Sequence, residues 1–203
     1  VNRIRKRYII EDDYDSEFRY NGRFILPLYA QDTQNRVIYI NTFSKSLVPS
    51  LRISYMVLPR RLLERYEATM SFYSCTVSSF EQYTLARFIS QGYFERHINK
   101  MKLYYREQRS KILQAIKESP LAKISTITER NAGTHFLLHI QTHLTEAEVR
   151  RAAEGACLHL SFYSDYSYKK ITSAGITLVI NYAGIEENKI GEVVQRLEKI
   201  FMQ

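Results

Sequence analysis

The sequence predicts an α/β fold with a mixed, mostly parallel sheet, followed by a long linking helix and a smaller α+β region. Two nearly continuous apolar runs, Val37 to Ile40 and Ile53 to Leu58, have the length and composition of buried strands. An amphipathic stretch from Tyr93 to Glu118 contains neither glycine nor proline, so it predicts one long helix. After Pro120 the pattern changes to short strands and shorter helices.

Further elements are expected around the two apolar runs. Residues 8–14 begin with three apolar side chains and are expected to be extended. Apolar residues recur at helical spacing over residues 60–74 and 78–90, which predicts two helices. Ser79 suits the start of the second helix, and Gly92 ends it.

The last part of the chain has its own pattern. Strands are predicted at 133–140, 157–162 and 176–182, and the final helix at 186–201. Another helix starts at Thr145, because Glu148 three residues later gives the spacing of a capping box. His135 and His139 would share one face of a strand, so we expect packing there rather than a metal site.

Composition limits the classes of protein to consider. The 203 residues are 45% hydrophobic, which is enough for real cores. The net charge of +8, with Arg3, Arg5, Lys6 and Arg7 at the start, favours weak attraction to polyanions such as DNA, although solvated surface charge explains the same pattern. Two distant cysteines and the absence of a membrane-length apolar segment predict a soluble, cytoplasmic protein without metal.

A candidate for covalent chemistry follows the first apolar run. Lys45 lies in the run Thr42-Phe43-Ser44-Lys45-Ser46, and Arg52 follows seven residues later. A lysine amine can form an imine with an aldehyde, while hydroxyls and an arginine can hold a phosphate. These are the groups that bind pyridoxal 5'-phosphate (PLP), so the sequence predicts a PLP site with Lys45 as its catalytic residue.

Acidic residues follow the first expected strand. If residues 8–14 are extended, Asp12 and Tyr14 point the same way. A carboxylate keeps the pyridine nitrogen of PLP protonated, and a phenol can bond the ring hydroxyl. Alternation turns Asp13 away and leaves Asp15 beyond the strand, so both are expected to be solvated or capping groups.

Four segments together resemble the MocR subfamily of GntR-type bacterial transcription regulators. They are Glu11 to Tyr20, Thr42 to Leu47, Pro49 to Ile53 and Gly92 to Ile98. The resemblance implies part of a fold-type I aminotransferase-like domain. It also implies that Lys45 matches the Schiff-base lysine, Asp12 the partner of the pyridine nitrogen and Tyr14 the residue at the ring hydroxyl. The phosphate would be held by Thr42, Ser44 and Arg52.

The resemblance also implies an organisation and a function. Residues 1–92 would be the remainder of the large PLP-binding domain, 93–119 the linking helix and 120–203 the small α+β domain. The chain would be a C-terminal fragment without its winged-helix DNA-binding domain. Its role would be to sense a small amino compound, and the whole protein would be a homodimer that binds DNA. Two alternatives are an aminotransferase acting on a small amino acid and a scaffold that holds no cofactor.

One departure from the family concerns the effector. Fold-type I aminotransferases usually clamp a substrate carboxylate with an arginine of the small domain. No arginine occurs between Arg151 and Arg196. Either the effector lacks a carboxylate at that position, or Lys169 and Lys170 replace the arginine. Tyr163, Tyr166 and Tyr168 would either line a pocket or form a solvated loop.

Overall fold

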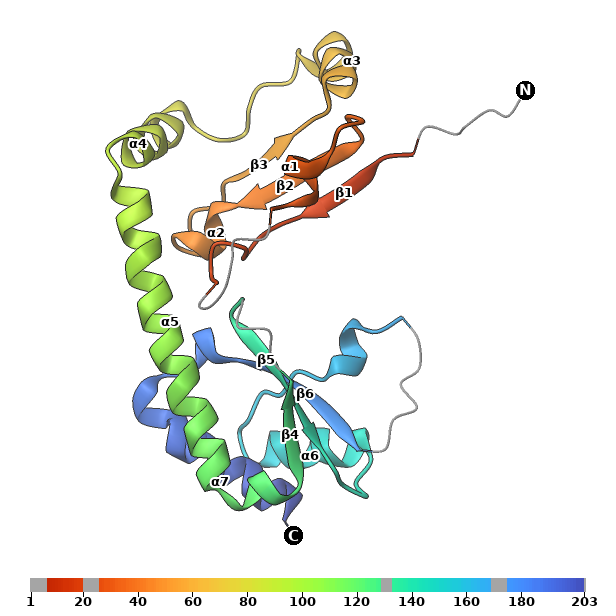
Figure 1. The fold of residues 1–203 in the computed structure, drawn as a ribbon, viewed down its shortest axis with the longest axis vertical. Helices are drawn as coiled ribbons and strands as arrows, with labels where there is room; N and C mark the ends of the chain where they lie inside the picture. The colour runs from red at the N-terminus through yellow and green to blue at the C-terminus, as the bar shows by residue number, and fades with distance from the viewer. Residues whose placement is uncertain (1–6, 20–25, 129–132, 169–174, 203) are drawn as a thin grey trace, which may run out of the picture. The chain divides into compact units, whose positions relative to one another are not determined.

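The computed structural model describes residues 7–19, 26–128, 133–168 and 175–202 (Figure 1). The chain divides into two compact units, Val1–Met101 and Lys102–Gln203. The division falls inside the long helix α5, Tyr93–Glu118, whose predicted bounds are confirmed. Lys169 and Lys170 lie outside the described residues.

Unit 1 contains a three-stranded mixed sheet in the order β1-β2-β3. Strands β1 (Ile9–Asp12) and β2 (Val37–Thr42) are parallel, and β3 (Ser54–Val57) is antiparallel to β2. Strand β1 is shorter than the extended segment predicted at residues 8–14, because the chain bends after Asp13. The predicted mixture of parallel and antiparallel pairing is confirmed for these three strands.

The described residues of unit 1 form four further helices. Helix α1 (Leu28–Gln31) is a single turn whose first amides, on Leu28 and Tyr29, donate to the Glu11 carboxylate at 2.7 and 2.8 Å. The others are α2 (Phe43–Ser46), α3 (Arg60–Met70) and α4 (Ser79–Ser90). Helix α4 begins at Ser79, as predicted, and its cap is Ser78, whose hydroxyl accepts from the Glu81 amide.

Unit 2 has an antiparallel sheet in the order β4-β5-β6. Its strands are β4 (Ser125–Thr128), β5 (His135–Ile140) and β6 (Ile176–Asn181), and the sequence pattern did not indicate β4. Alternate residues of β5 and β6 face inward. They form three buried cross-strand pairs, which are Phe136 with Ile180, Leu138 with Leu178, and Ile140 with Ile176.

Helices complete the core of unit 2. Helix α6 (Glu146–Gly155) packs with α7 (Ile190–Phe201) (Figure 1). The second half of α5 contributes Ile112 and Ile116, which are both buried, to the core. Short 3-10 turns connect these elements; they are η1 (Pro120–Lys123), η2 (Tyr163–Tyr166), η3 (Tyr182–Gly184) and η4 (Glu187–Lys189). Across the four described ranges, no helix is long and apolar enough to cross a membrane.

The prediction of a strand at residues 157–162 is wrong. Cys157 has a φ of 53°, in the left-handed region that follows a helix end, and the Leu158 amide donates to the Ala153 carbonyl at 2.8 Å. The Arg196 guanidinium donates a hydrogen bond to the Ala156 carbonyl at 2.7 Å. Only Phe162 forms a bridge, with Leu178. The segment has the sequence pattern of a strand. However, backbone groups at its start form hydrogen bonds with the end of α6 and with Arg196 instead of with a neighbouring strand.

The predicted capping box at the start of α6 is confirmed. The Glu148 amide donates to the Thr145 hydroxyl, and the Glu148 carboxylate accepts from the Thr145 amide at 2.7 Å. The Thr145 hydroxyl also donates to the Glu148 carboxylate at 2.7 Å. This bond is the largest cause that holds the pKa of Glu148 below its ordinary value, and the bond from the Thr145 amide is the second. The stability they provide is therefore present above the ordinary carboxyl pKa and is lost as the pH falls through the lowered value.

Thr145→Ala is expected to lower the free energy of unfolding of unit 2 by about 1 kcal/mol, because the first turn of α6 loses its side-chain acceptor. Urea denaturation followed by circular dichroism measures the change. Thr145→Ser keeps the hydroxyl and should restore most of the loss. If the serine variant were as unstable as the alanine variant, methyl packing rather than capping would be the cause.

Candidate functional site

The two parallel strands of unit 1 end at the same edge of the sheet, each with a polar residue. Asp12 is the last residue of β1 and Thr42 the last of β2. The register pairs Asp12 with Ile40, so Asp12 lies on the same face as Ile40 and Thr42. In open α/β sheets, ligands bind outside the carboxyl ends of parallel strands. The structure therefore brings the predicted Asp12 and Thr42 together at a suitable edge.

The loop between β2 and β3 is tied to itself by the predicted hydroxyls. Thr42 Oγ1 accepts from the Ser44 amide and donates to the Ile53 carbonyl, both at 3.2 Å. Ser44 Oγ donates to the Leu51 carbonyl at 2.8 Å. These bonds fold the loop back on α2. As a result, Leu51, the residue before Arg52, lies beside Ser44. The three residues predicted to hold a phosphate thus lie in one closed loop.

Lys45 lies in the last turn of α2 and is exposed, as is Arg52. Asp12 is also exposed. Tyr14 is 40% exposed and lies beyond the end of β1, so strand alternation does not place its side chain beside Asp12. The expectation that Asp12 and Tyr14 lie on one face of a strand is wrong, because β1 ends at Asp12 and does not include Tyr14.

Asp13 is not the solvated or capping group that alternation suggested. Its carboxylate accepts from the Tyr39 hydroxyl and from the Ser16 hydroxyl, both at 2.9 Å. Asn41 continues the network, since its amide donates to the Tyr39 oxygen at 3.0 Å and to Glu17 Oε1 at 3.4 Å. Tyr39 and Asn41 are on the face of β2 opposite to Thr42. This polar network therefore lies on the face of the sheet opposite to Thr42.

Burial shifts the acid strengths in this second network. Desolvation raises the pKa of Glu17, and the hydrogen bond from Asn41 only partly opposes it. Desolvation also raises the pKa values of Tyr39 and Tyr55 above the ordinary tyrosine value. Both tyrosines are neutral near neutral pH, and the Tyr39 hydroxyl donates to Asp13.

Sequence reasoning missed this second network. The signal available was the spacing of Tyr39 and Asn41 in an otherwise apolar strand, because residues two apart share a face. Glu17 carried no such signal, since it lies in a turn whose path depends on tertiary contacts.

Curated proteins of similar sequence include transcription regulators. An uncharacterized HTH-type transcriptional regulator of Bacillus subtilis, YdeL, is 40% identical over 192 residues, which are 94% of this chain and 41% of the relative. The probable rhizopine catabolism regulatory protein MocR of Rhizobium meliloti is 35% identical over 195 residues, 96% of this chain and 39% of the relative. The chain is an aminotransferase-like region of the MocR type. It spans about 40% of the length of these relatives. No family model matches it.

A solved structure shows the fold of this MocR-type chain. A kynurenine aminotransferase from Pyrococcus horikoshii, solved in complex with PMP, superposes with a TM-score of 0.80 at 27% sequence identity. The match covers 95% of this chain and 47% of that one. The predicted fold-type I aminotransferase-like fold is confirmed.

Other sequence expectations concern unit 2 of the MocR-type chain. Tyr163, Tyr166 and Tyr168 are 42%, 70% and 105% exposed, which agrees with a solvated loop rather than a pocket. His139 Nδ1 is 3.0 Å from the Thr177 hydroxyl, in a strand where His135 shares its face. Among the described residues, no group of histidine, cysteine and acidic side chains could hold a metal ion.

Proposed function

We propose that this chain is the PLP-binding, effector-sensing part of a GntR/MocR-type transcription regulator. The observation that carries the proposal is the edge of unit 1 where Asp12 and Thr42 end two parallel strands and the lysine loop follows. The similarity to HTH-type regulators supports the regulatory role. The similarity to an aminotransferase structure solved with PMP supports the cofactor.

The residues at this edge fit the chemistry of PLP. Lys45 would hold the cofactor through Nζ, and the Asp12 carboxylate would pair with the pyridine nitrogen. Arg52 would contact the phosphate with Thr42 and Ser44. Both hydroxyls now donate to carbonyls of the loop, so each would exchange that acceptor for a phosphate oxygen. Tyr14 would reach the ring hydroxyl from beyond the strand end.

Sensing would depend on whether the Lys45 amine is bonded to the cofactor. When bound, PLP supplies a carbonyl-derived carbon at which amines exchange, and a ring that withdraws electrons. A small amino compound that took the place of Lys45 on that carbon would leave Lys45 with a free amine at the end of α2. The signal would pass to a winged-helix domain on DNA in a homodimer only if the two ligand states differ in affinity for DNA.

The experiment that tests the assignment is a PLP titration followed by absorbance. Asp12→Asn is expected to weaken PLP binding about 10-fold, because the pyridinium loses a charge-assisted hydrogen bond. Asp13→Asn is the matched control, since Asp13 instead accepts from Tyr39 and Ser16. A loss in Asp13→Asn with none in Asp12→Asn would show that the neighbouring acid is the partner.

The same samples distinguish sensing from turnover. Small amino compounds are expected to change the absorbance of the PLP-loaded wild type without continued formation of a keto acid. Continued formation with an added 2-oxo acid would favour the second candidate, an aminotransferase acting on a small amino acid. The similarity to the kynurenine aminotransferase supports that candidate.

A further inference from the structure

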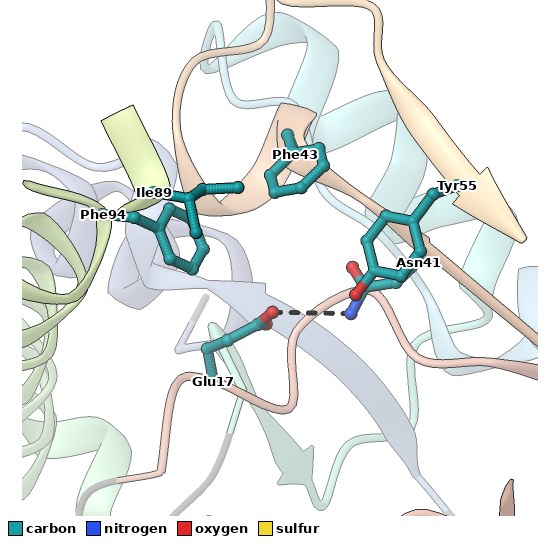
Figure 2. Close-up of a pocket in the computed structure, with 6 residues that line it drawn as sticks. All are labelled: Glu17, Asn41, Phe43, Tyr55, Ile89 and Phe94. Atoms are coloured by element: carbon teal, nitrogen blue, oxygen red, sulfur yellow. Dashed lines mark hydrogen bonds between the residues drawn. The ribbon is translucent and has the colours of Figure 1, made fainter. Parts of the chain in front are cut away.

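A pocket of about 460 Å³ lies in unit 1. It is lined by Glu17, Asn41, Phe43, Tyr55, Ile89 and Phe94. The Glu17 carboxylate lies across the hollow from the Phe43 ring, as Figure 2 shows. The walls are mostly apolar, so the pocket combines a hydrocarbon surface with one acidic group. Its volume is sufficient for a small organic molecule.

One oxygen of the acidic group has no partner. Glu17 Oε1 accepts a hydrogen bond from Asn41 at 3.4 Å, whereas Oε2 is shielded from solvent and has no hydrogen bond in the described residues. A buried carboxylate oxygen without a donor is unfavourable, and a cationic donor is its strongest complement. The raised pKa of Glu17 has the same origin, because desolvation dominates its causes.

The aromatic walls favour the same kind of ligand. The Phe43 ring is 5.4 Å from that of Tyr55 and 5.9 Å from that of Phe94, measured between centroids. Negative ring faces attract cations, most strongly where water is excluded. The carboxylate and the rings therefore act in the same direction, while Ile89 adds apolar contact for the body of the ligand.

We propose that this pocket binds an organic cation with an apolar body, whose guanidinium, amidinium or ammonium head pairs with the Glu17 carboxylate. The body would pack on Phe43, Tyr55 and Phe94. Asn41 and Tyr55 of the pocket lie on the face of the sheet opposite to Thr42, whereas Phe43 shares helix α2 with Lys45. The proposal does not depend on PLP binding.

The probe is benzamidinium, compared with the neutral isostere benzamide, by isothermal titration calorimetry on the 203-residue chain without PLP. An amidine does not form an imine with PLP. The result of this experiment is therefore independent of whether PLP attaches to Lys45. Wild type is expected to bind benzamidinium about 10-fold more tightly than benzamide. Benzamidinium binding should weaken as the pH falls through the carboxyl range, because protonated Glu17 no longer offers a charge.

Two variants complete the test. Glu17→Gln keeps the shape of the side chain and should remove the preference for the cation and its pH dependence. Ile89→Trp fills the pocket from a position that is already 42% exposed, so the fold should tolerate it while both probes lose binding. The proposal is overturned if wild type binds the two probes equally or not at all. It is also overturned if the preference survives in Glu17→Gln, or if binding is unchanged in Ile89→Trp.

Discussion

Lys45→Ala is expected to abolish covalent attachment of PLP to the protein. The lysine amine is the group that can bond the aldehyde carbon, and alanine offers no replacement. Lys45 is exposed at the end of α2, so its removal should leave the fold intact. The Thr42 cap on the Ser44 amide, which shapes α2, does not involve Lys45. The effect on attachment is therefore expected to be complete, while the effect on stability should be small.

Absorbance of the PLP-loaded protein, followed by borohydride reduction and peptide mass mapping, measures the attachment. Wild type should carry the reduced cofactor on the peptide that contains Lys45, and Lys45→Ala should carry none there. Lys100→Ala is the matched control, because Lys100 is another exposed lysine and lies on α5. Identical spectra for wild type and Lys45→Ala, or attachment at Lys100, would refute the assignment of Lys45.

The positions of Thr42 and Asp12 in the candidate site of unit 1 follow from local sequence. Thr42 caps α2 because a hydroxyl beside the first helical amide is a local arrangement, and Asp12 is placed by strand periodicity. The partners of Asp13 were not predictable, since they depend on where β1 ends. Its amide still donates to the Ile40 carbonyl at 2.9 Å, and the chain then bends so that the carboxylate meets Tyr39 from the next strand.

Unit 2 shows the same difference between local and non-local information. The bounds of α5 follow from an uninterrupted amphipathic pattern, and the cap of α6 from the spacing of Thr145 and Glu148. Residues 157–162 have an apolar pattern typical of a strand. However, β6 pairs with β5, and this segment reaches β6 only through the Phe162 bridge and the bond from the Val179 amide to the Ser161 carbonyl at 2.8 Å.

Phe136→Ala is expected to cost unit 2 about 3 to 5 kcal/mol of unfolding free energy, the usual loss for a buried phenylalanine. Phe136 is 2% exposed and pairs across the sheet with Ile180. Its ring stacks on Tyr182 with centroids 6.3 Å apart, and the Tyr182 hydroxyl donates to the Gly133 carbonyl. Alanine would leave a cavity beside a tyrosine held by that bond, so the core can collapse only partly.

Urea denaturation gives the size of this loss, and hydrogen exchange of the β5 and β6 amides locates it in unit 2. His135→Ala is the control, because His135 is the adjacent residue of β5 and its side chain is exposed on the other face. The control should change stability by no more than about 0.5 kcal/mol. Equal losses in both variants would mean that the faces of β5 are assigned wrongly. A loss below about 1 kcal/mol for Phe136→Ala would mean that the ring does not fill a packed core.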